Sequence, residues 1–217
     1  MKSASSVKTD IRNIFCVGRN YRDHATELGN AVPTEPMIFG KFTHALEEAR
    51  GTVELPSERG EIHHELEIVL YIAKQVTLES TARDVVGAIA LGLDLTDRSA
   101  QSRLKEKGHP WEFAKSFVGS AVITDFYAFD DFSQVEQAKF RLEINGKSVQ
   151  EGVPTDMVFD FTTLIRYTHK HFGLNQGDIL FTGTPAGVGP LRDGDTCILR
   201  LNDTVVGEFH VTQSTNG

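Results

Sequence analysis

Aliphatic residues occupy every second position from residue 66 to residue 72. Leu66, Ile68, Leu70 and Ile72 alternate with Glu65, Glu67, Val69 and Tyr71. A period of two residues predicts a β-strand over 63–72, with both carboxylates on one face and the aliphatic row on the other. Two interpretations of the glutamate face are open at this point. It is either a solvated polar face or two oxygen ligands for a divalent cation.

Other apolar runs predict further short elements. Strands are expected over 11–17, 37–42, 87–95, 140–144, 147–150 and 179–182, and helices over 81–85, 98–107 and 158–172. Ser80 is a plausible cap for the first of these helices, and a polar loop is expected over 51–60. Asn145-Gly146 predicts a type I′ hairpin. Many short strands with few helices favour an α+β, mainly β domain over alternating βαβ units.

Composition narrows the class of protein. The 217 residues fit a single domain, 1–217, with a polar lead over 1–10. Thirty acidic and 22 basic residues give a formal charge of −8, which argues against nucleic acid or an anionic membrane as the main partner. The sequence has no apolar signal segment and no run long enough to cross a bilayer, so a cytoplasmic location is expected. Cys16 and Cys197 lie in apolar runs, as buried free thiols do.

Four polar features are candidates for chemistry. Asp94 closes an apolar strand. It either caps the helix that follows or, if Thr96 or Asp97 caps that helix, serves as a third oxygen ligand. His24 and Glu27 are spaced i, i+3 on a short helix that Gly29 stops, as a surface ion pair or an acid/base pair. Lys115 lies between apolar neighbours and must either snorkel or meet an anion. The Gly/Pro loop over 182–190 either cradles an anion or only turns the chain.

Five motifs together resemble the fumarylacetoacetate hydrolase family, and in particular its small single-domain acylpyruvate hydrolase and oxaloacetate decarboxylase branch. They are Cys16-Val17-Gly18-Arg19-Asn20-Tyr21, His63-His64-Glu65-Leu66-Glu67, Leu93-Asp94-Leu95-Thr96, Gly108-His109-Pro110-Trp111 with Ala114-Lys115-Ser116-Phe117, and the loop from Thr182 to Pro190. The resemblance implies a mixed β-roll with flanking short helices and a homodimer. It also implies Mg²⁺ or Mn²⁺ held by Glu65, Glu67 and Asp94.

The same resemblance assigns roles to six other residues. His24 and Glu27 match the family's acid/base dyad, and Lys115 matches the lysine that faces the substrate. Arg19, Gln101 and Thr184 fall at positions that resemble substrate contacts. The sequence departs from the family at 40–42, where a Lys-Pro pair is common, and at 97–99, where Ala-Arg-Asp is common. His63 and His64 receive no role.

The expected function is therefore metal-dependent hydrolysis of a small-molecule α-keto acid. An acylpyruvate would be cleaved at a C–C bond to pyruvate and a carboxylic acid, through an enolate that the metal stabilises. Oxaloacetate decarboxylation or tautomerisation, or isomerisation of a dienoate diacid, are alternatives for the same site. A non-catalytic member that only binds a metal or ligand is a further alternative.

Overall fold

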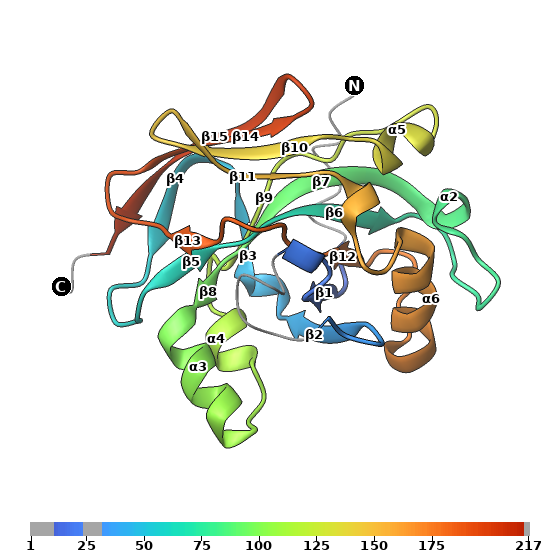
Figure 1. The fold of residues 1–217 in the computed structure, drawn as a ribbon, viewed down its shortest axis with the longest axis horizontal. Coiled ribbons are helices and arrows are strands. Elements are labelled where there is room, and N and C mark those ends of the chain that lie inside the picture. Colours follow the sequence, from blue (N-terminus) through green and yellow to red (C-terminus); the bar gives the residue numbers. More distant parts are fainter. Residues whose placement is uncertain (1–10, 24–31, 215–217) are drawn as a thin grey trace.

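The computed structural model describes residues 11–23 and 32–214, and most of its regular elements are strands (Figure 1). Within these residues, seven strands form the main sheet. In spatial order they are β2 (Met37–Lys41), β1 (Ile14–Gly18), β12 (Ile179–Phe181), β6 (Leu66–Ile72), β7 (Val86–Asp94), β9 (Ala121–Ile123) and β3 (Leu46–Glu48). The long strands β6 and β7 pair antiparallel through the middle of this sheet.

Two smaller sheets complete the β structure of the described residues. A five-stranded sheet runs in the order β11 (Lys147–Gly152), β10 (Phe140–Ile144), β14 (Thr196–Leu201), β15 (Thr204–Gln213) and β4 (Arg50–Leu55). A short three-stranded sheet contains β13 (Gly189–Pro190), β5 (Ile62–His64) and β8 (Thr96–Asp97). Figure 1 shows the five-stranded sheet lying over β6 and β7. The predicted mainly β class is confirmed.

Short helices flank the sheets. They are α2 (Ala82–Val85), α3 (Arg98–Lys107), α4 (Glu112–Lys115), α5 (Ser133–Glu136) and α6 (Phe161–Phe172), with 3₁₀ turns η2 (Thr43–Ala45) and η3 (Pro154–Asp156). In Figure 1, α3 and α4 lie together below β5 and β8, and α6 lies at the other end of the molecule. No helix in the described part of the chain is long and apolar enough to cross a bilayer.

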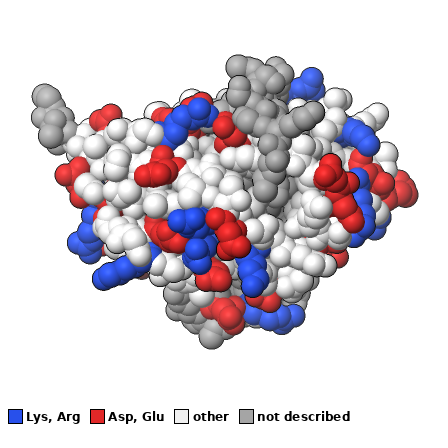
Figure 2. Space-filling view, turned by 90° about the horizontal axis from the view of Figure 1, so that it is seen from above, with Lys and Arg blue, Asp and Glu red and all other residues white. Residues whose placement is uncertain are grey.

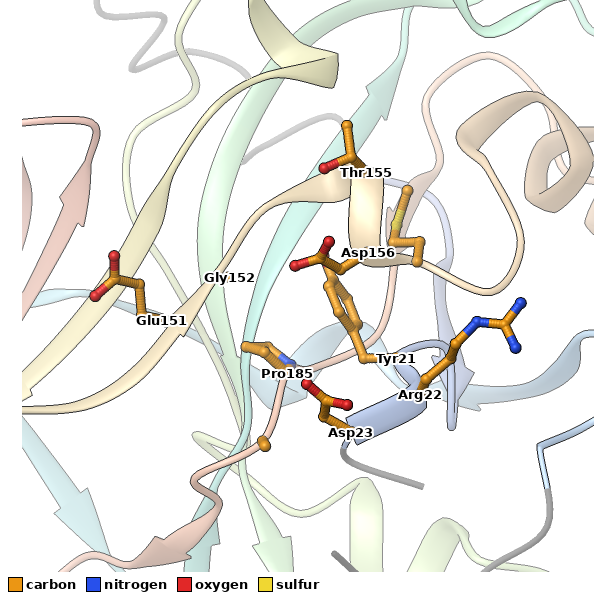
Figure 3. Close-up of a pocket in the computed structure, with 10 residues that line it drawn as sticks. Tyr21, Arg22, Asp23, Glu151, Gly152, Thr155, Asp156 and Pro185 are labelled. Atoms are coloured by element: carbon orange, nitrogen blue, oxygen red, sulfur yellow. The ribbon is translucent and has the colours of Figure 1, made fainter. Parts of the chain in front are cut away.

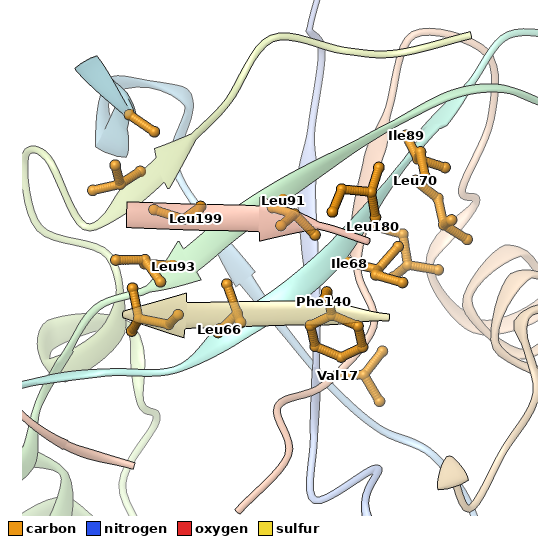
Figure 4. Packing of buried hydrophobic residues seen from close by; sticks show 14 of the residues in the cluster. Val17, Leu66, Ile68, Leu70, Ile89, Leu91, Leu93, Phe140, Leu180 and Leu199 are labelled. Atoms are coloured by element: carbon orange, nitrogen blue, oxygen red, sulfur yellow. The ribbon is translucent and has the colours of Figure 1, made fainter. Parts of the chain in front are cut away.

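The aliphatic row of β6 forms the centre of the main hydrophobic core. Leu66, Ile68, Leu70 and Ile72 have no exposed surface, and they belong to one cluster with Leu91, Leu93, Phe140 and Leu199 from β7, β10 and β14 (Figure 4). The opposite face of the sheet is also covered, because Val69 packs in a second cluster with Cys16, Ala90 and Phe181. Both faces of β6 are therefore buried, and its glutamate face cannot be a simple solvated face.

Three predicted boundaries are wrong. Residues 50–55 form strand β4, not a loop; Val53 and Leu55 face inward between exposed positions, and β4 pairs parallel with β15. The strand predicted over 63–72 is interrupted at Glu65, because β5 pairs with β8 and β13 whereas β6 pairs with β7 and β12. The helix predicted over 158–172 begins only at Phe161, where the Asp160 side chain accepts a hydrogen bond from Thr163 N.

Local signals at turns and caps are mostly confirmed. Asn145 and Gly146 have φ of 52° and 76°, as a type I′ turn requires. Asp97 caps α3 by accepting a hydrogen bond from Ala100 N at 2.9 Å. The cap of α2 is Thr81, through a capping box with Asp84, and not Ser80.

Charge is evenly mixed on the face drawn in Figure 2. Lysine and arginine side chains alternate with aspartate and glutamate, and no large patch of one sign covers the described residues on that face.

Candidate metal centre

Three buried carboxylates meet at one end of β6 and β7. Glu65 directly precedes β6, Glu67 is the second residue of β6, and Asp94 is the last residue of β7. One oxygen from each residue lies within 4.8 Å of the others, and the three residues are between 1% and 6% exposed. Asp94 is free for this role because Asp97 caps α3, which resolves the alternative left open by the sequence. Hard oxygen ligands in this arrangement suit a divalent cation such as Mg²⁺ or Mn²⁺.

Lys115 lies directly against this centre. Its Nζ donates to Glu65 Oε2 at 2.7 Å and to Asp94 Oδ2 at 2.6 Å. The side chain is 2% exposed, so the ammonium meets anions and does not snorkel to solvent. Burial alone lowers the pKa of Lys115, but the charges of Asp94 and Glu65 outweigh burial and raise that pKa above its ordinary value. Lys115 therefore carries a permanent positive charge at the site.

Two further cations pair with Asp94 and Glu65, and neither was predicted to lie at the metal centre. Lys41 Nζ lies 2.8 Å from Asp94 Oδ1, a distance within ion-pair range although the angles are not those of a hydrogen bond. Arg98 donates to Glu65 Oε1 at 2.7 Å and to Gln101 Oε1 at 2.7 Å. The available signals were Lys41 inside an apolar strand, Arg98 three residues before Gln101, and the family resemblance, which has a lysine within 40–42 and an arginine within 97–99.

Lys41 is also the structural anchor under the centre. Its ammonium donates to the carbonyl oxygens of Ser120 at 2.9 Å and Leu95 at 3.2 Å, and to that of Lys115. These carbonyls belong to the segments that carry Asp94 and Lys115. A single buried lysine thus fixes two parts of the site relative to β2.

Glu67 differs from the other two carboxylates, because no cation of the described residues forms an ion pair with it. Its Oε2 accepts a hydrogen bond from Gly183 N at 2.6 Å. Gly183 has φ of +100°, and a Cβ there would lie 2.6 Å from the Asn20 Cβ, so a glycine is needed to bring this N–H to the carboxylate. Burial, followed by the negative charges of Asp94 and Glu65, raises the pKa of Glu67 well above its ordinary value. Charge crowding of this kind favours a bound cation.

Two buried amides hold the Gly/Pro loop in place beside Glu67. Asn20 donates to the carbonyl oxygens of Thr182 at 2.8 Å and Phe159 at 3.1 Å. Gln150 accepts from Leu66 N at 2.9 Å and donates to Thr184 Oγ1 at 2.8 Å and to the Pro185 carbonyl at 3.0 Å. The loop over 182–190 is therefore fixed to β6 and positions the Gly183 N–H.

His64 belongs to this supporting network. Its Nδ1 lies 2.8 Å from Gln150 Oε1, and burial lowers its pKa, which favours the neutral imidazole. Of the two histidines that received no role from the sequence, His64 therefore has a structural one.

The predicted substrate contacts have different surroundings. Gln101 is buried, and the bond from Arg98 to its amide oxygen leaves its amide nitrogen as a donor. Thr184 uses its hydroxyl within the protein, donating to Leu66 O at 2.9 Å and accepting from Gln150. Arg19 lies just after β1 with φ of 59°, an uncommon conformation for a residue with a side chain. His24 and Glu27 lie outside the described residues.

A pocket of about 470 Å³ opens beside the same loop (Figure 3). Its lining includes Tyr21, Arg22, Asp156 and Pro185 but none of the three carboxylates. Tyr21 lies close enough to the metal centre to feel the charge of Glu67. Burial raises the pKa of its phenol, and the negative charges of Glu67 and Asp156 raise it further. The Tyr21 hydroxyl is buried and has no hydrogen-bond partner among residues 11–23 and 32–214.

Comparison with known proteins identifies the family. The model of the fumarylacetoacetate hydrolase C-terminal domain matches residues 13–214. The chain belongs to the fumarylacetoacetate hydrolase family. This membership confirms the resemblance drawn from the five motifs, and the carboxylate centre makes the chain a metal-dependent enzyme of that family.

Curated relatives of this family member share a common name. The chain is 37% identical to a mitochondrial oxaloacetate tautomerase of Caenorhabditis elegans, over 97% of this chain and 100% of the relative. It is 39% identical to the human mitochondrial oxaloacetate tautomerase, over 92% of this chain and 91% of the relative. The identity to the oxaloacetate tautomerase YcgM of Escherichia coli is 39%, over 85% and 86% of the two chains.

A solved structure adds a ligand-bound neighbour. The fumarylpyruvate hydrolase from Pseudomonas aeruginosa, in complex with Mn²⁺ and pyruvate, superposes with a TM-score of 0.87 at 31% identity. The match covers 94% of this chain and 91% of that one. The fold and the family are thus common to a tautomerase group and a hydrolase group.

Proposed function

We propose that this family member interconverts the keto and enol forms of oxaloacetate at the carboxylate centre. The observation that carries the proposal is the buried centre of Glu65, Glu67 and Asp94 with the Lys115 ammonium against it. Relatives named oxaloacetate tautomerases, 37% to 39% identical over most of the chain, support this choice of reaction. Tautomerisation stood among the alternatives from the sequence, behind acylpyruvate hydrolysis.

The reaction moves one proton and no heavy atom. A proton leaves C3 of oxaloacetate, and negative charge develops on the C2 oxygen until that oxygen is protonated. The divalent cation, when bound, supplies a Lewis acid for the keto acid's oxygens. Catalysis then requires fixed positive charge near the C2 oxygen and a group that exchanges a proton with C3.

Lys115 is suited to the first of these roles. Its ammonium is held in place by two carboxylates, and those carboxylates raise its pKa, so it remains protonated. A protonated lysine stabilises a developing oxyanion and cannot accept the C3 proton. Gln101 adds an amide donor to the same region, oriented by its bond from Arg98.

The acid/base role falls to His24, with Glu27 as its partner. This pair is predicted from the sequence and lies outside the described residues. A histidine is chemically suitable, because its ordinary pKa lets it accept and return a proton near neutral pH.

Acylpyruvate hydrolysis is the second candidate function. The Pseudomonas aeruginosa fumarylpyruvate hydrolase, seen with Mn²⁺ and pyruvate, favours it through its closely similar fold. The same stabilised enolate would act as leaving group, but hydrolysis also requires a water molecule at the distal carbonyl. Decarboxylation of oxaloacetate and isomerisation of a dienoate diacid would use the enolate without this water.

The deciding experiment measures three activities on one metal-loaded preparation. Enol absorbance of oxaloacetate in the ultraviolet follows tautomerisation, a coupled lactate dehydrogenase assay follows pyruvate release, and acetylpyruvate and fumarylpyruvate test hydrolysis. We expect rapid loss of the enol signal without matching pyruvate release, with Mg²⁺ and Mn²⁺ compared side by side. Faster pyruvate release from an acylpyruvate than enol loss would replace the first proposal by the second. No activity in any assay would leave a metal- or ligand-binding role.

The homodimer and the cytoplasmic location remain predictions from the sequence. Size-exclusion chromatography with light scattering measures the mass in solution, and a single-chain mass of 24.0 kDa would contradict the dimer. Fractionation of the source cells followed by immunodetection tests the location.

A further inference from the structure

One face of α3 is directed toward the metal centre. Arg98, Gln101 and Lys105 are spaced i, i+3 and i+7, which places them in one row along the helix. The first two already belong to the site, because Arg98 donates to Glu65 and to the buried Gln101. Lys105 is the next member of the row, two turns along the helix from Arg98.

An aromatic wall connects Lys105 with Lys115. The Lys105 Nζ lies 5.1 Å from the centre of the Trp111 ring, and the Trp111 and Phe39 rings are 5.9 Å apart. Phe39 in turn lies 5.0 Å from Lys115 Nζ. The two ammonium groups thus approach the same wall from opposite ends, with Lys115 at the metal centre and Lys105 further out.

Arg19 approaches this wall from β1. A Cβ at Gly18 would lie 3.8 Å from the Trp111 ring, so the end of β1 packs directly against the tryptophan. Arg19 follows in the left-handed conformation with φ of 59°. Residues other than glycine and asparagine seldom adopt this conformation, and such strain is often found at functional sites.

Lys105 and Arg19 differ from the inner cations, because within the described residues neither forms an ion pair. Arg98 and Lys115 form ion pairs with the carboxylates of the centre. Neither Lys105 nor Arg19 forms an ion pair with any residue in the described ranges 11–23 and 32–214. Partial burial, followed by the positive charges of Arg19 and Arg98, lowers the pKa of Lys105 to about 8. The negative charge of Glu65 acts on Lys105 more weakly than these positive charges. Like charges brought together with no ion-pair partner among the described residues indicate a place for an anion from outside the protein.

We propose that Lys105 and Arg19 form a subsite for the second carboxylate of a dicarboxylate keto acid, and that Lys105 sets the preference for such substrates. The inference rests on the proposed function, because it takes the keto acid to be bound at Glu65, Glu67 and Asp94. The C1 carboxylate and C2 oxygen of oxaloacetate then lie at the centre, and the C4 carboxylate extends along the wall of Phe39 and Trp111. The Lys105 ammonium offers up to three donors there, while Arg19 offers a planar fork.

Oxaloacetate and pyruvate test this subsite directly, because they share the keto acid head and differ only by the C4 carboxylate. Trp111 is the only tryptophan of the chain, so its fluorescence reports binding at the wall itself. The experiment is a stopped-flow fluorescence titration of the Mg²⁺-loaded protein with each ligand, completed before oxaloacetate decays. Lys105→Gln is compared with wild type, with Lys105→Arg as the variant that retains the charge. Lys107→Gln is the matched control, an exposed lysine on the same helix, about 200° around from Lys105.

Loss of one charge-assisted hydrogen bond predicts that Lys105→Gln weakens oxaloacetate binding about 10- to 100-fold. Pyruvate affinity should stay within about twofold, since pyruvate has no group at this subsite. Lys105→Arg should recover most of the oxaloacetate affinity, and Lys107→Gln should match wild type. Equal weakening of both ligands, or of neither, would overturn the role of Lys105.

The failure of this inference can be told apart from failure of the proposed function. A wild-type protein that tautomerises oxaloacetate but binds it no more tightly than pyruvate would remove the subsite and leave the reaction in place. A wild-type protein without tautomerase activity that binds neither ligand would remove both.

Discussion

Glu67 provides the sharpest test of the metal centre. It is 1% exposed and lies near the Glu65 and Asp94 carboxylates. Among residues 11–23 and 32–214, the only group that hydrogen-bonds to its carboxylate is the Gly183 N–H. Two unit charges no more than 4.8 Å apart repel by at least roughly 3.5 kcal/mol at an effective dielectric constant of about 20. The cations on Glu65 and Asp94 reduce this repulsion, but they do not pair with Glu67.

The sign of the resulting pH dependence follows from the raised pKa. Between the ordinary value of 4.5 and the raised value in the fold, folded Glu67 holds a proton that the unfolded chain has released. The stability contributed by that proton is fully present below pH 4.5 and is lost as the pH rises through this window. The loss amounts to about 1.4 kcal/mol per pH unit for one group. Metal-free protein should therefore lose this contribution to its free energy of unfolding as the pH increases across the window.

Glu67→Gln removes the titration and keeps an oxygen for the Gly183 N–H. In metal-free protein at the acidic end of the window, the variant and wild type should have the same free energy of unfolding. As the pH rises across the window, the variant should become more stable than wild type by about 1.4 kcal/mol per pH unit. Urea unfolding of chelator-treated protein, from about pH 5 to about pH 8, measures the difference. Glu208→Gln, an exposed glutamate on β15, is the control and should run parallel to wild type.

Added metal should make wild type more stable than Glu67→Gln, the reverse of the order expected without metal. At a Mn²⁺ concentration about 100 times the dissociation constant, wild type should gain about 2.7 kcal/mol. Glu67→Gln, with one anionic ligand fewer, should gain far less. A variant that shows the wild-type pH slope without metal, or wild-type stabilisation with Mn²⁺, would refute the assignment of Glu67 as a charge-crowded ligand.

The remaining predictions concern other parts of the site. Lys41→Met should lower the free energy of unfolding by about 3–5 kcal/mol in urea, because it removes one of the two buried cations that pair with Asp94 and leaves buried carbonyl oxygens without their donor. Exposed Lys147→Met should have little effect. Gln150→Leu should lower it by about 1–3 kcal/mol and increase hydrogen exchange in the loop over 182–190, and unchanged exchange would exclude Gln150 as the loop's anchor. His24→Ala should reduce tautomerase activity by about 10²–10⁴-fold while calorimetric Mn²⁺ affinity stays at the wild-type value, and full activity would remove His24 from the mechanism.

Local features of the fold could be predicted from the sequence because their causes are local. The two-residue period of β6, the Asn145-Gly146 turn and the Asp97 cap depend on neighbours within a few positions. The order of the family motifs also predicted that Glu65, Glu67 and Asp94 form one metal centre. Strand β4 was missed because two inward residues between exposed ones make a weak pattern, and because its partner β15 lies at the far end of the chain.

The electrostatic character of the site was decided by tertiary structure. The sequence pattern of β6 left a solvated glutamate face and a cation site both open. Only the burial of both sheet faces made Glu67 a carboxylate crowded by other negative charges. Lys41 meets Asp94 across 53 positions of sequence, and no local period could have paired them. The sequence by itself determined which residues could bind a cation. The tertiary structure decided which of their charges are neutralised, because strand pairing and burial set the distances and the dielectric between them.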